Sequence, residues 1–113
     1  MNQMHDDEFA DVMRALGHPV RLSILRILAE NAQNECCCTD VTECLPLAQS
    51  TVSQHIKVLL DAGLVARSPK GTRNCYSLNA ERLDALNASF SGLFSGLVAD
   101  RSSAPRQAET EPA

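Results

Sequence analysis

The pattern of apolar positions predicts a mainly helical chain. In the longer segments, apolar residues recur at steps of three and four, the spacing that places them on one face of a helix. Polar, glycine-containing or proline-containing stretches separate these segments, so the helices should be distinct elements joined by short connections. The predicted helices span about 6–16, 19–30, 40–45, 50–62 and 80–99.

Glycine and proline mark the ends of these helices. Gly17 and Gly63 each follow a periodic segment, the position at which glycine commonly ends a helix. Pro19 suits a first helical turn, where its missing N–H is not needed. Pro46 should stop the short helix, and the segment 31–40 before it shows no clear periodicity. That segment is interpreted as a loop.

A short β-hairpin is predicted between the fourth and fifth helices. Segments 64–67 and 75–78 are strand-like, and they flank Ser-Pro-Lys-Gly-Thr at 68–72, a typical turn sequence. The order helix, turn, helix, hairpin is that of a winged helix-turn-helix fold. A basic hairpin suits phosphate or minor-groove contact, although a solvated loop can have the same composition. The basic residues around the turn are Arg67, Lys70 and Arg73.

Hydrogen-bonding residues gather at the start of the helix predicted over 50–62, which Gln49 or Ser50 can cap. Val52 and Ile56 should point inward, leaving the polar residues on the outer face. The major groove of DNA, about 12 Å wide, admits one α-helix, and side chains near the helix N-terminus reach the base edges. A polar outer face is also typical of any surface helix; the basic hairpin favours DNA. The candidate reading residues are Gln49, Ser50, Thr51, Ser53, Gln54, His55 and Lys57.

The last helix carries a coiled-coil-like apolar stripe with Phe94 beside it. Ala88, Gly92 and Gly96 recur every four residues and would let another backbone approach closely. The stripe either packs within the subunit or pairs in part with a second copy, and the small size of the chain favours pairing. The residues of the stripe are Leu83, Leu86, Phe90, Leu93 and Leu97.

Composition indicates one folded domain. The chain has 113 residues, 44% of them hydrophobic and 21% charged, which is typical of a soluble globular protein. We expect a domain over 1–100 and a disordered polar tail over 101–113. No stretch suits a membrane span or secretory signal, so we expect a cytoplasmic protein with no membrane partner.

Charge is distributed unevenly along the chain. The net charge of −4 divides into −5 over 1–48 (three Arg, eight acids), +3 over 49–77 (four basic residues, one acid) and −2 over 78–113 (three basic, five acids). Charges farther apart than a Debye length of about 8–10 Å are screened, so a local basic surface can attract phosphates on an acidic protein. Double-stranded DNA therefore remains a suitable partner.

Five cysteines, clustered and odd in number, favour free thiols or thiolate ligands over a disulfide framework. Three are consecutive, Cys36, Cys37 and Cys38. Thiolates select soft, thiophilic ions, and three adjacent thiols can converge on one centre only from an irregular segment. The two separated Cys or His pairs of a tetrahedral zinc site are absent. Cys44 is an additional candidate donor, and Cys75 is expected to be a small buried residue.

Three segments together resemble the ArsR/SmtB family of metal-responsive bacterial repressors. They read ALGHPVRLSIL at 15–25, LAQSTVSQHIKVL at 47–59 and AGLV at 62–65, and the likeness extends over roughly 8–98. The resemblance implies a homodimeric winged helix-turn-helix repressor, paired through its first and last helices, that leaves its operator when an inducer binds. It also implies a structural or phosphate-contacting role for Arg21.

The cysteine cluster is similar to that of the arsenic- and antimony-sensing branch, whose motif is glutamate, any residue, cysteine, any residue, cysteine, aspartate. When Glu35 and Asp40 are aligned with the motif, Cys37 matches its first cysteine and Thr39 takes the place of its second. We therefore expect two or three of the consecutive cysteines Cys36, Cys37 and Cys38 to bind the metal. The zinc site that other members build between their last helices needs histidines there, and this chain has none at that place.

These features favour a repressor released by trivalent arsenic or antimony, with no organic cofactor. A repressor of the same fold that senses oxidation or persulfides, with Cys44 or Cys75 as the resolving thiol, is the alternative. A thiol-dependent enzyme or metal carrier is least favoured, because no Cys-x-x-Cys and no pairing of base and nucleophile is present.

Overall fold

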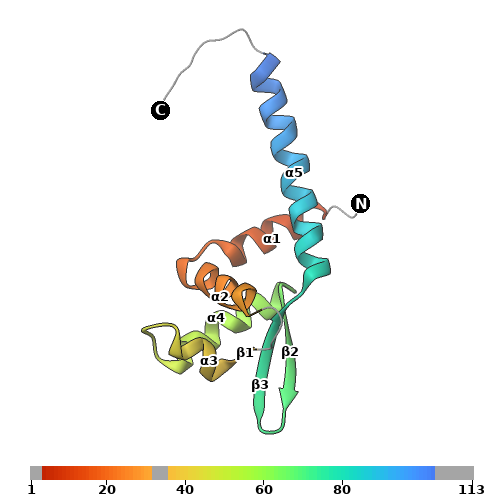
Figure 1. The fold of residues 1–113 in the computed structure, drawn as a ribbon. Coiled ribbons are helices and arrows are strands. Elements are labelled where there is room, and N and C mark those ends of the chain that lie inside the picture. The colour runs from red at the N-terminus through yellow and green to blue at the C-terminus, as the bar shows by residue number, and fades with distance from the viewer. Residues whose placement is uncertain (1–3, 32–35, 104–113) are drawn as a thin grey trace.

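The computed structural model describes residues 4–31 and 36–103; for 36–40 and 100–103 it describes the backbone alone. Over these ranges the chain forms helices and a three-stranded antiparallel sheet, and the outer part of the last helix projects from the domain (Figure 1). The prediction of a mainly helical winged helix-turn-helix fold is confirmed. The elements are α1 (Asp6–Leu16), α2 (Pro19–Glu30), β1 (Cys36–Cys37), α3 (Cys38–Glu43), α4 (Gln49–Asp61), β2 (Val65–Lys70), β3 (Arg73–Leu78) and α5 (Ala80–Ser103).

The first two helices have the predicted bounds. Phe9 and Val12 of α1 and Ile24 and Leu28 of α2 are buried in one core. Pro19 opens α2, and the N-cap residue His18 accepts a hydrogen bond from the backbone N–H of Val20 through Nδ1 at 3.1 Å. The amphipathic pattern and the local end signals act together here, so these helices are readable from sequence.

The segment interpreted as a loop over 31–40 contains regular structure. Cys36 and Cys37 form β1, which pairs with β3, and α3 begins at Cys38, two residues before the predicted start. A strand of two residues has no readable periodicity, and its partner lies almost forty positions away in the chain. Residues 32–35 lie outside the described part.

The hairpin is longer and its turn tighter than predicted. The strands β2 and β3 stay paired as far as Lys70 opposite Arg73, so only Gly71 and Thr72 form the turn. Gly71 has φ +65°, the positive φ that two-residue hairpin turns require and glycine readily adopts. Pro69 lies inside β2, which is tolerated because the strand order β1-β3-β2 makes β2 an edge strand.

A compact junction joins α4, the hairpin and α5. Gly63, with φ +80°, ends α4: its N–H donates to Leu60, and the N–H of Leu64 donates to Leu59, the two bonds of a Schellman motif. Asn79 caps α5 by accepting from the backbone N–H of Arg82 at 3.2 Å. Its side-chain amide donates to the carbonyl of Gly63 at 3.0 Å. One asparagine therefore fastens the start of α5 to the end of α4.

Helix α5 has an inner part that packs on α1 and an outer part that is exposed. Phe90 meets Phe9 of α1 edge to face, with ring centroids 5.6 Å apart, and Leu86 is buried. From residue 91 to 99 every position is exposed. The predicted stripe therefore packs within the subunit over its first half only, and the helix continues to Ser103, past the predicted end. The tail from 104 lies outside the described residues. No helix in the described ranges is long and apolar enough to cross a bilayer.

Candidate nucleic-acid interface

Helix α4 presents a polar face because its apolar residues are anchored in the core. Val52, Ile56 and Leu59 are at most 2% exposed, as the sequence predicts for the first two. The start of the helix differs from expectation: Ala48 is the N-cap residue and makes no side-chain capping bond, so neither Gln49 nor Ser50 caps it. Both of these polar residues are exposed.

Most of the predicted reading residues on α4 are accessible. Gln49, Ser50, Ser53, Gln54 and Lys57 are exposed, whereas Thr51 and His55 are half-buried. Lys57 forms an ion pair with Asp61 one turn later, at 3.1 Å. Both of these side chains are largely solvated, so the pair is weak and leaves the lysine able to exchange partners.

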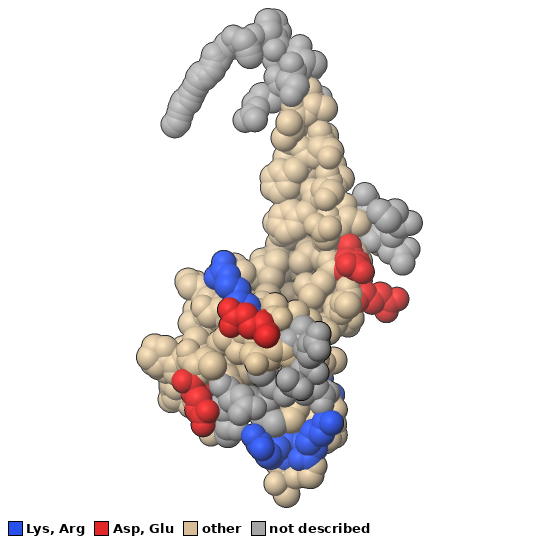
Figure 2. All heavy atoms as spheres, viewed as in Figure 1, with Lys and Arg blue, Asp and Glu red and all other residues tan. Residues whose placement is uncertain are grey.

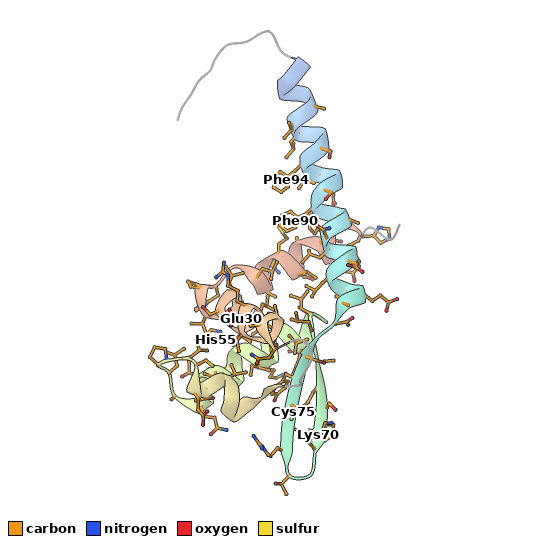
Figure 3. All side chains as sticks on the ribbon, viewed as in Figure 1. Glu30, His55, Lys70, Cys75, Phe90 and Phe94 are labelled. Carbon is orange, nitrogen blue, oxygen red and sulfur yellow. The ribbon has the colours of Figure 1, made fainter. Side chains whose placement is uncertain are left out.

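His55 belongs to an internal cluster as well as to the outer face of α4. Its ring centroid lies 4.4 Å from that of His18, and its Nδ1 accepts a hydrogen bond from Nε of Arg21 at 3.3 Å. Burial lowers the pKa of His55 below 6.5, and the neighbouring charges of His18 and Arg21 lower it further. Figure 3 shows His55 between the helices at the side of the domain. The ring is therefore held neutral, as its acceptor role requires.

Arg21 joins three helices. Besides bonding His55 of α4, its Nη1 donates to the carbonyls of Arg14 and Ala15 in the last turn of α1, at 3.3 and 3.1 Å. The carbonyl of Arg14 also accepts from the N–H of Gly17, and the arginine adds a charged donor at the end of the helix, where carbonyls lack partners within the helix. Of the two roles that the resemblance implies for Arg21, these contacts support the structural one. Sequence reasoning missed the link to His55, whose only signal is a pair of polar residues 34 positions apart.

The hairpin contributes an exposed basic surface. Arg67, Lys70 and Arg73 are all exposed, and Figure 2 shows lysine and arginine side chains gathered over the hairpin end of the molecule. The hairpin follows α4 after three residues, and α4 and β2 are in contact. The two predicted DNA-contacting elements are thus held in one unit, the arrangement in which a helix enters a groove and a wing contacts the backbone.

The cysteines lie on elements that belong to this unit or adjoin it. Cys36 and Cys37 form β1 and Cys38 starts α3, while their side chains lie outside the described part. Cys44 is exposed and free. Cys75, in the central strand β3, is 4% exposed, as predicted. It is disulfide-bonded, so the expectation of free thiols or thiolate ligands is wrong for this residue, which the alternative named as a resolving thiol. Among the described side chains, no three His, Cys, Asp or Glu residues are grouped as metal ligands.

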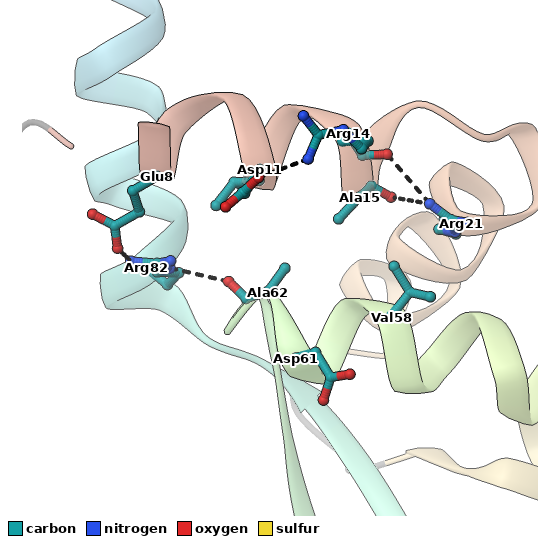
Figure 4. Close-up of a pocket in the computed structure, with 10 residues that line it drawn as sticks. Glu8, Asp11, Arg14, Ala15, Arg21, Val58, Asp61, Ala62 and Arg82 are labelled. Atoms are coloured by element: carbon teal, nitrogen blue, oxygen red, sulfur yellow. Dashed lines mark hydrogen bonds and ion pairs between the residues drawn. The ribbon is translucent and has the colours of Figure 1, made fainter. Parts of the chain in front are cut away.

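A hollow of about 470 Å³ lies between α1, the end of α4 and the start of α5 (Figure 4). Arg82 spans it, bonding Glu8 of α1 at 2.5 Å and the carbonyl of Ala62 at 3.1 Å. On its rim, Arg14 pairs with Asp11 at 2.6 Å. Arg82 thus ties α5 to α1 and to the residue that follows α4, so the hollow is a structural joint. Arg82 was not singled out from the sequence, where it is one arginine on a helix.

Comparison with known proteins decides the family. A family model described as a helix-turn-helix domain matches residues 16–67. The arsenical resistance operon repressor of Bacillus subtilis is 35% identical over 79 residues, which are 70% of this chain and 73% of that protein. The chain belongs to the ArsR/SmtB family. The predicted family is confirmed, and with it the assignment as a DNA-binding transcriptional repressor rather than an enzyme.

Solved structures agree with the ArsR/SmtB assignment. A possible transcriptional regulator for arsenical resistance matches with a TM-score of 0.66 at 29% identity, over 80% of this chain and 95% of that one. The homodimeric winged helix-turn-helix DNA-binding domain of a possible ArsR-family regulator from Mycobacterium bovis matches with a TM-score of 0.61 at 26% identity. That match covers 96% of this chain and 99% of that domain.

Proposed function

We propose that this ArsR/SmtB repressor binds its operator as a homodimer and is released by trivalent arsenic or antimony, bound by two or three of Cys36, Cys37 and Cys38. The observation that carries the proposal is the place of the cluster. The change from β1 to α3 falls between Cys37 and Cys38, so the three residues share no single strand or helix. Neighbours within one strand or helix diverge, so this break between two elements is what favours Cys37 and Cys38 reaching one ion.

The cluster is joined to both DNA-contacting elements. Through the chain it leads into α3, which packs on α4, and Val41 of α3 is fully buried in the core. Through backbone pairing, β1 is attached to β3 of the hairpin. Drawing the thiols toward an ion therefore moves residues tied to the reading helix and to the wing together. The inducer favours the conformation with lower DNA affinity, with a coupling of about 1–3 kcal/mol typical of such linkage.

In the complex, the N-terminal part of α4 occupies the major groove and the hairpin contacts the phosphate backbone. The exposed amides and hydroxyls of α4 suit base edges, whereas the guanidinium and ammonium groups of the hairpin suit phosphates. The half-buried His55 serves mainly to position α4, through its bond from Arg21. The base-reading set is Gln49, Ser50, Thr51, Ser53, Gln54 and Lys57, and the phosphate-contacting set is Arg67, Lys70 and Arg73.

The second subunit covers the apolar surface of α5. Leu93, Phe94, Leu97 and Val98 are 45–53% exposed, and Phe94 stacks on Phe90 with centroids 5.5 Å apart. Both phenylalanines project from one side of α5 (Figure 3). A groove of about 640 Å³ between α1 and α5 continues this surface. The homodimeric state of the M. bovis domain with the same fold supports a homodimer for this chain.

The chemistry of thiols and the names of the relatives both favour trivalent arsenic or antimony as the inducer. Trivalent arsenic and antimony are thiophilic, and a trigonal pyramidal centre is satisfied by two or three thiolates where a structural zinc site needs four donors. The B. subtilis relative is an arsenical resistance operon repressor, which supports an arsenical inducer for this chain.

The proposal is tested by fluorescence anisotropy of a labelled duplex from the promoter of the chain's own operon, at one stated salt concentration. Arsenite, antimonite, cadmium and zinc are titrated into the complex of the reduced protein. We expect release by micromolar arsenite or antimonite and a response at least tenfold weaker in Cys37→Ser. Cys44→Ser, at an exposed free thiol, is the matched control and should respond as wild type. Undiminished arsenite release from Cys37→Ser would show that the site is wrongly assigned.

A further inference from the structure

The pairing of β1 with β3 brings a fourth cysteine to the cluster. Cys37 lies directly opposite Cys75, and Cys36 lies opposite Tyr76. On its other side Cys75 faces Ser68 of β2, so it occupies the middle strand of the sheet. Figure 3 places Cys75 on β3 well above the hairpin tip. The hairpin and the segment before α3 therefore meet at two cysteines.

This register meets the geometric needs of a disulfide. Directly opposed residues of antiparallel strands have Cα atoms about 4.5 or 5.5 Å apart, depending on whether the pair exchanges hydrogen bonds. Disulfides join residues whose Cα atoms are about 4.4–6.8 Å apart. Cys36 is displaced by one position from this pair and lies opposite Tyr76 instead. Of the two cysteines in β1, Cys37 alone therefore has the register of a bonding partner.

The states of the described thiols agree with this pairing. Cys75 is disulfide-bonded, whereas Cys44, the other cysteine with a described side chain, is free and exposed. Cys75 is also 4% exposed, so a dissolved oxidant has little access to it. A buried thiol that faces another cysteine is suited to resolve an oxidised partner rather than to react first.

We propose that Cys37 and Cys75 form a redox pair whose disulfide makes the repressor insensitive to its metalloid inducer. The Cys37 thiolate attacks the terminal oxygen of a hydroperoxide, so that an S–O bond forms, the O–O bond breaks and the other peroxide oxygen leaves as hydroxide or alkoxide, which gives a sulfenic acid. The Cys75 thiol then attacks that sulfur, an S–S bond forms and water leaves. The pair of thiols has lost two electrons and two protons to the peroxide. In the disulfide, Cys37 has no thiolate to give to arsenic.

Through this pair, oxidation and arsenite both act on the binding of the operator. The disulfide holds β1 on β3 covalently, so the start of α3 cannot be drawn from the hairpin toward an ion. The oxidised protein therefore stays on its operator when arsenite is present, and reduction restores the response. This consequence rests on the proposed function, whereas the thiol pair itself does not.

The pair is mapped without any metalloid. Full-length protein is reduced with a phosphine, desalted, exposed to hydrogen peroxide, alkylated and digested with trypsin under non-reducing conditions. The cluster and Cys44 share the peptide 27–57, and Cys75 lies in 74–82. We expect these two peptides to be linked in wild type, Cys36→Ser and Cys44→Ser, and separate in Cys37→Ser. A link that persists in Cys37→Ser, or an alkylated Cys75 in oxidised wild type, overturns the pair.

The second arm measures arsenite release from the operator before and after peroxide. The arsenite concentration for half release should rise at least tenfold on oxidation of wild type and return to its original value when the oxidised protein is reduced with the phosphine. An equal response of oxidised and reduced wild type overturns the insensitivity. If the reduced protein is not released by arsenite, the proposed function fails and the insensitivity with it, while the mapping still decides the thiol pair.

Discussion

Replacing Gly63 by alanine should destabilise the junction behind the reading helix. The residue has φ +80° and makes the Schellman bond that ends α4. An alanine there adopts a backbone conformation that L-residues disfavour by about 1–2 kcal/mol. Its lower unfolded-state entropy offsets about 0.4–1 kcal/mol of this. The backbone alone therefore accounts for a net loss of roughly 1 kcal/mol.

A second contribution comes from crowding. A Cβ at Gly63 would lie 3.1 Å from Nε of Arg82, the atom that donates to the carbonyl of Ala62. Moving the guanidinium weakens this hydrogen bond, whose net worth is about 0.5–1.5 kcal/mol. We therefore expect Gly63→Ala to lower the free energy of unfolding by about 1–3 kcal/mol in total.

Two other glycines separate the contributions. Gly71 has φ +65° with nothing within 4 Å of its Cβ position, so Gly71→Ala reports the backbone term alone. Gly17 has an ordinary φ of −80°, and a Cβ there would make only ordinary van der Waals contacts with two carbonyl oxygens at 3.5 and 3.6 Å, so Gly17→Ala should be neutral or stabilising. The assay is urea unfolding at one protein concentration, because dimer stability depends on concentration. If Gly63→Ala loses no more stability than Gly71→Ala, or Arg82→Ala does not reduce the difference, the crowding argument is refuted.

Three further outcomes are expected. Arg67→Ala should weaken operator binding for all sequences and lower the slope of log K against log salt by about 0.9, one phosphate contact; an unchanged slope in a salt titration would remove Arg67 from the interface. Leu97→Glu, at a site 53% exposed on α5, should shift the dimer toward monomer in sedimentation, and an unaltered dimer would contradict pairing there. Because the pKa of His55 is lowered on folding, its contribution to stability is present above pH 6.5 and lost as pH falls through the lowered value. His55→Gln should therefore show a smaller loss of urea midpoint between pH 7.5 and 5.5 than wild type, and equal losses would contradict this.

The parts of the fold that could be predicted are those determined by residues close together in the sequence. The bounds of α1 and α2 follow from amphipathic spacing together with Gly17 and Pro19, and these helices match the prediction. The start of α3 and the existence of β1 depend on pairing with β3, which no local pattern records. The hairpin turn was predicted too long because Pro69 is typical of a turn. An edge strand tolerates proline, because one of its sides has no partner strand to which a backbone N–H must donate.

In the candidate site, too, features with local causes could be predicted and long-range contacts could not. The inward residues Val52 and Ile56 fix the outer face of α4, so the exposure of most reading residues could be deduced, and their contact with DNA stays a prediction. The bond from Arg21 to His55 and the register of Cys37 with Cys75 are long-range contacts. They depend on how helices and strands are placed against one another, and that information is absent from spacing along the chain.

The bonds of Asn79 bear on how far apart two operator half-sites must lie. Its amide holds Gly63, while its carbonyl oxygen caps the helix that carries the exposed apolar surface. A rotation of the reading helix is therefore passed to the pairing helix instead of being absorbed in a slack connection. In a symmetric dimer both copies of α4 would tilt together. The change in the distance between the two groove-inserted helices would then be twice that produced by one subunit, and this distance would no longer match the helical repeat of the duplex.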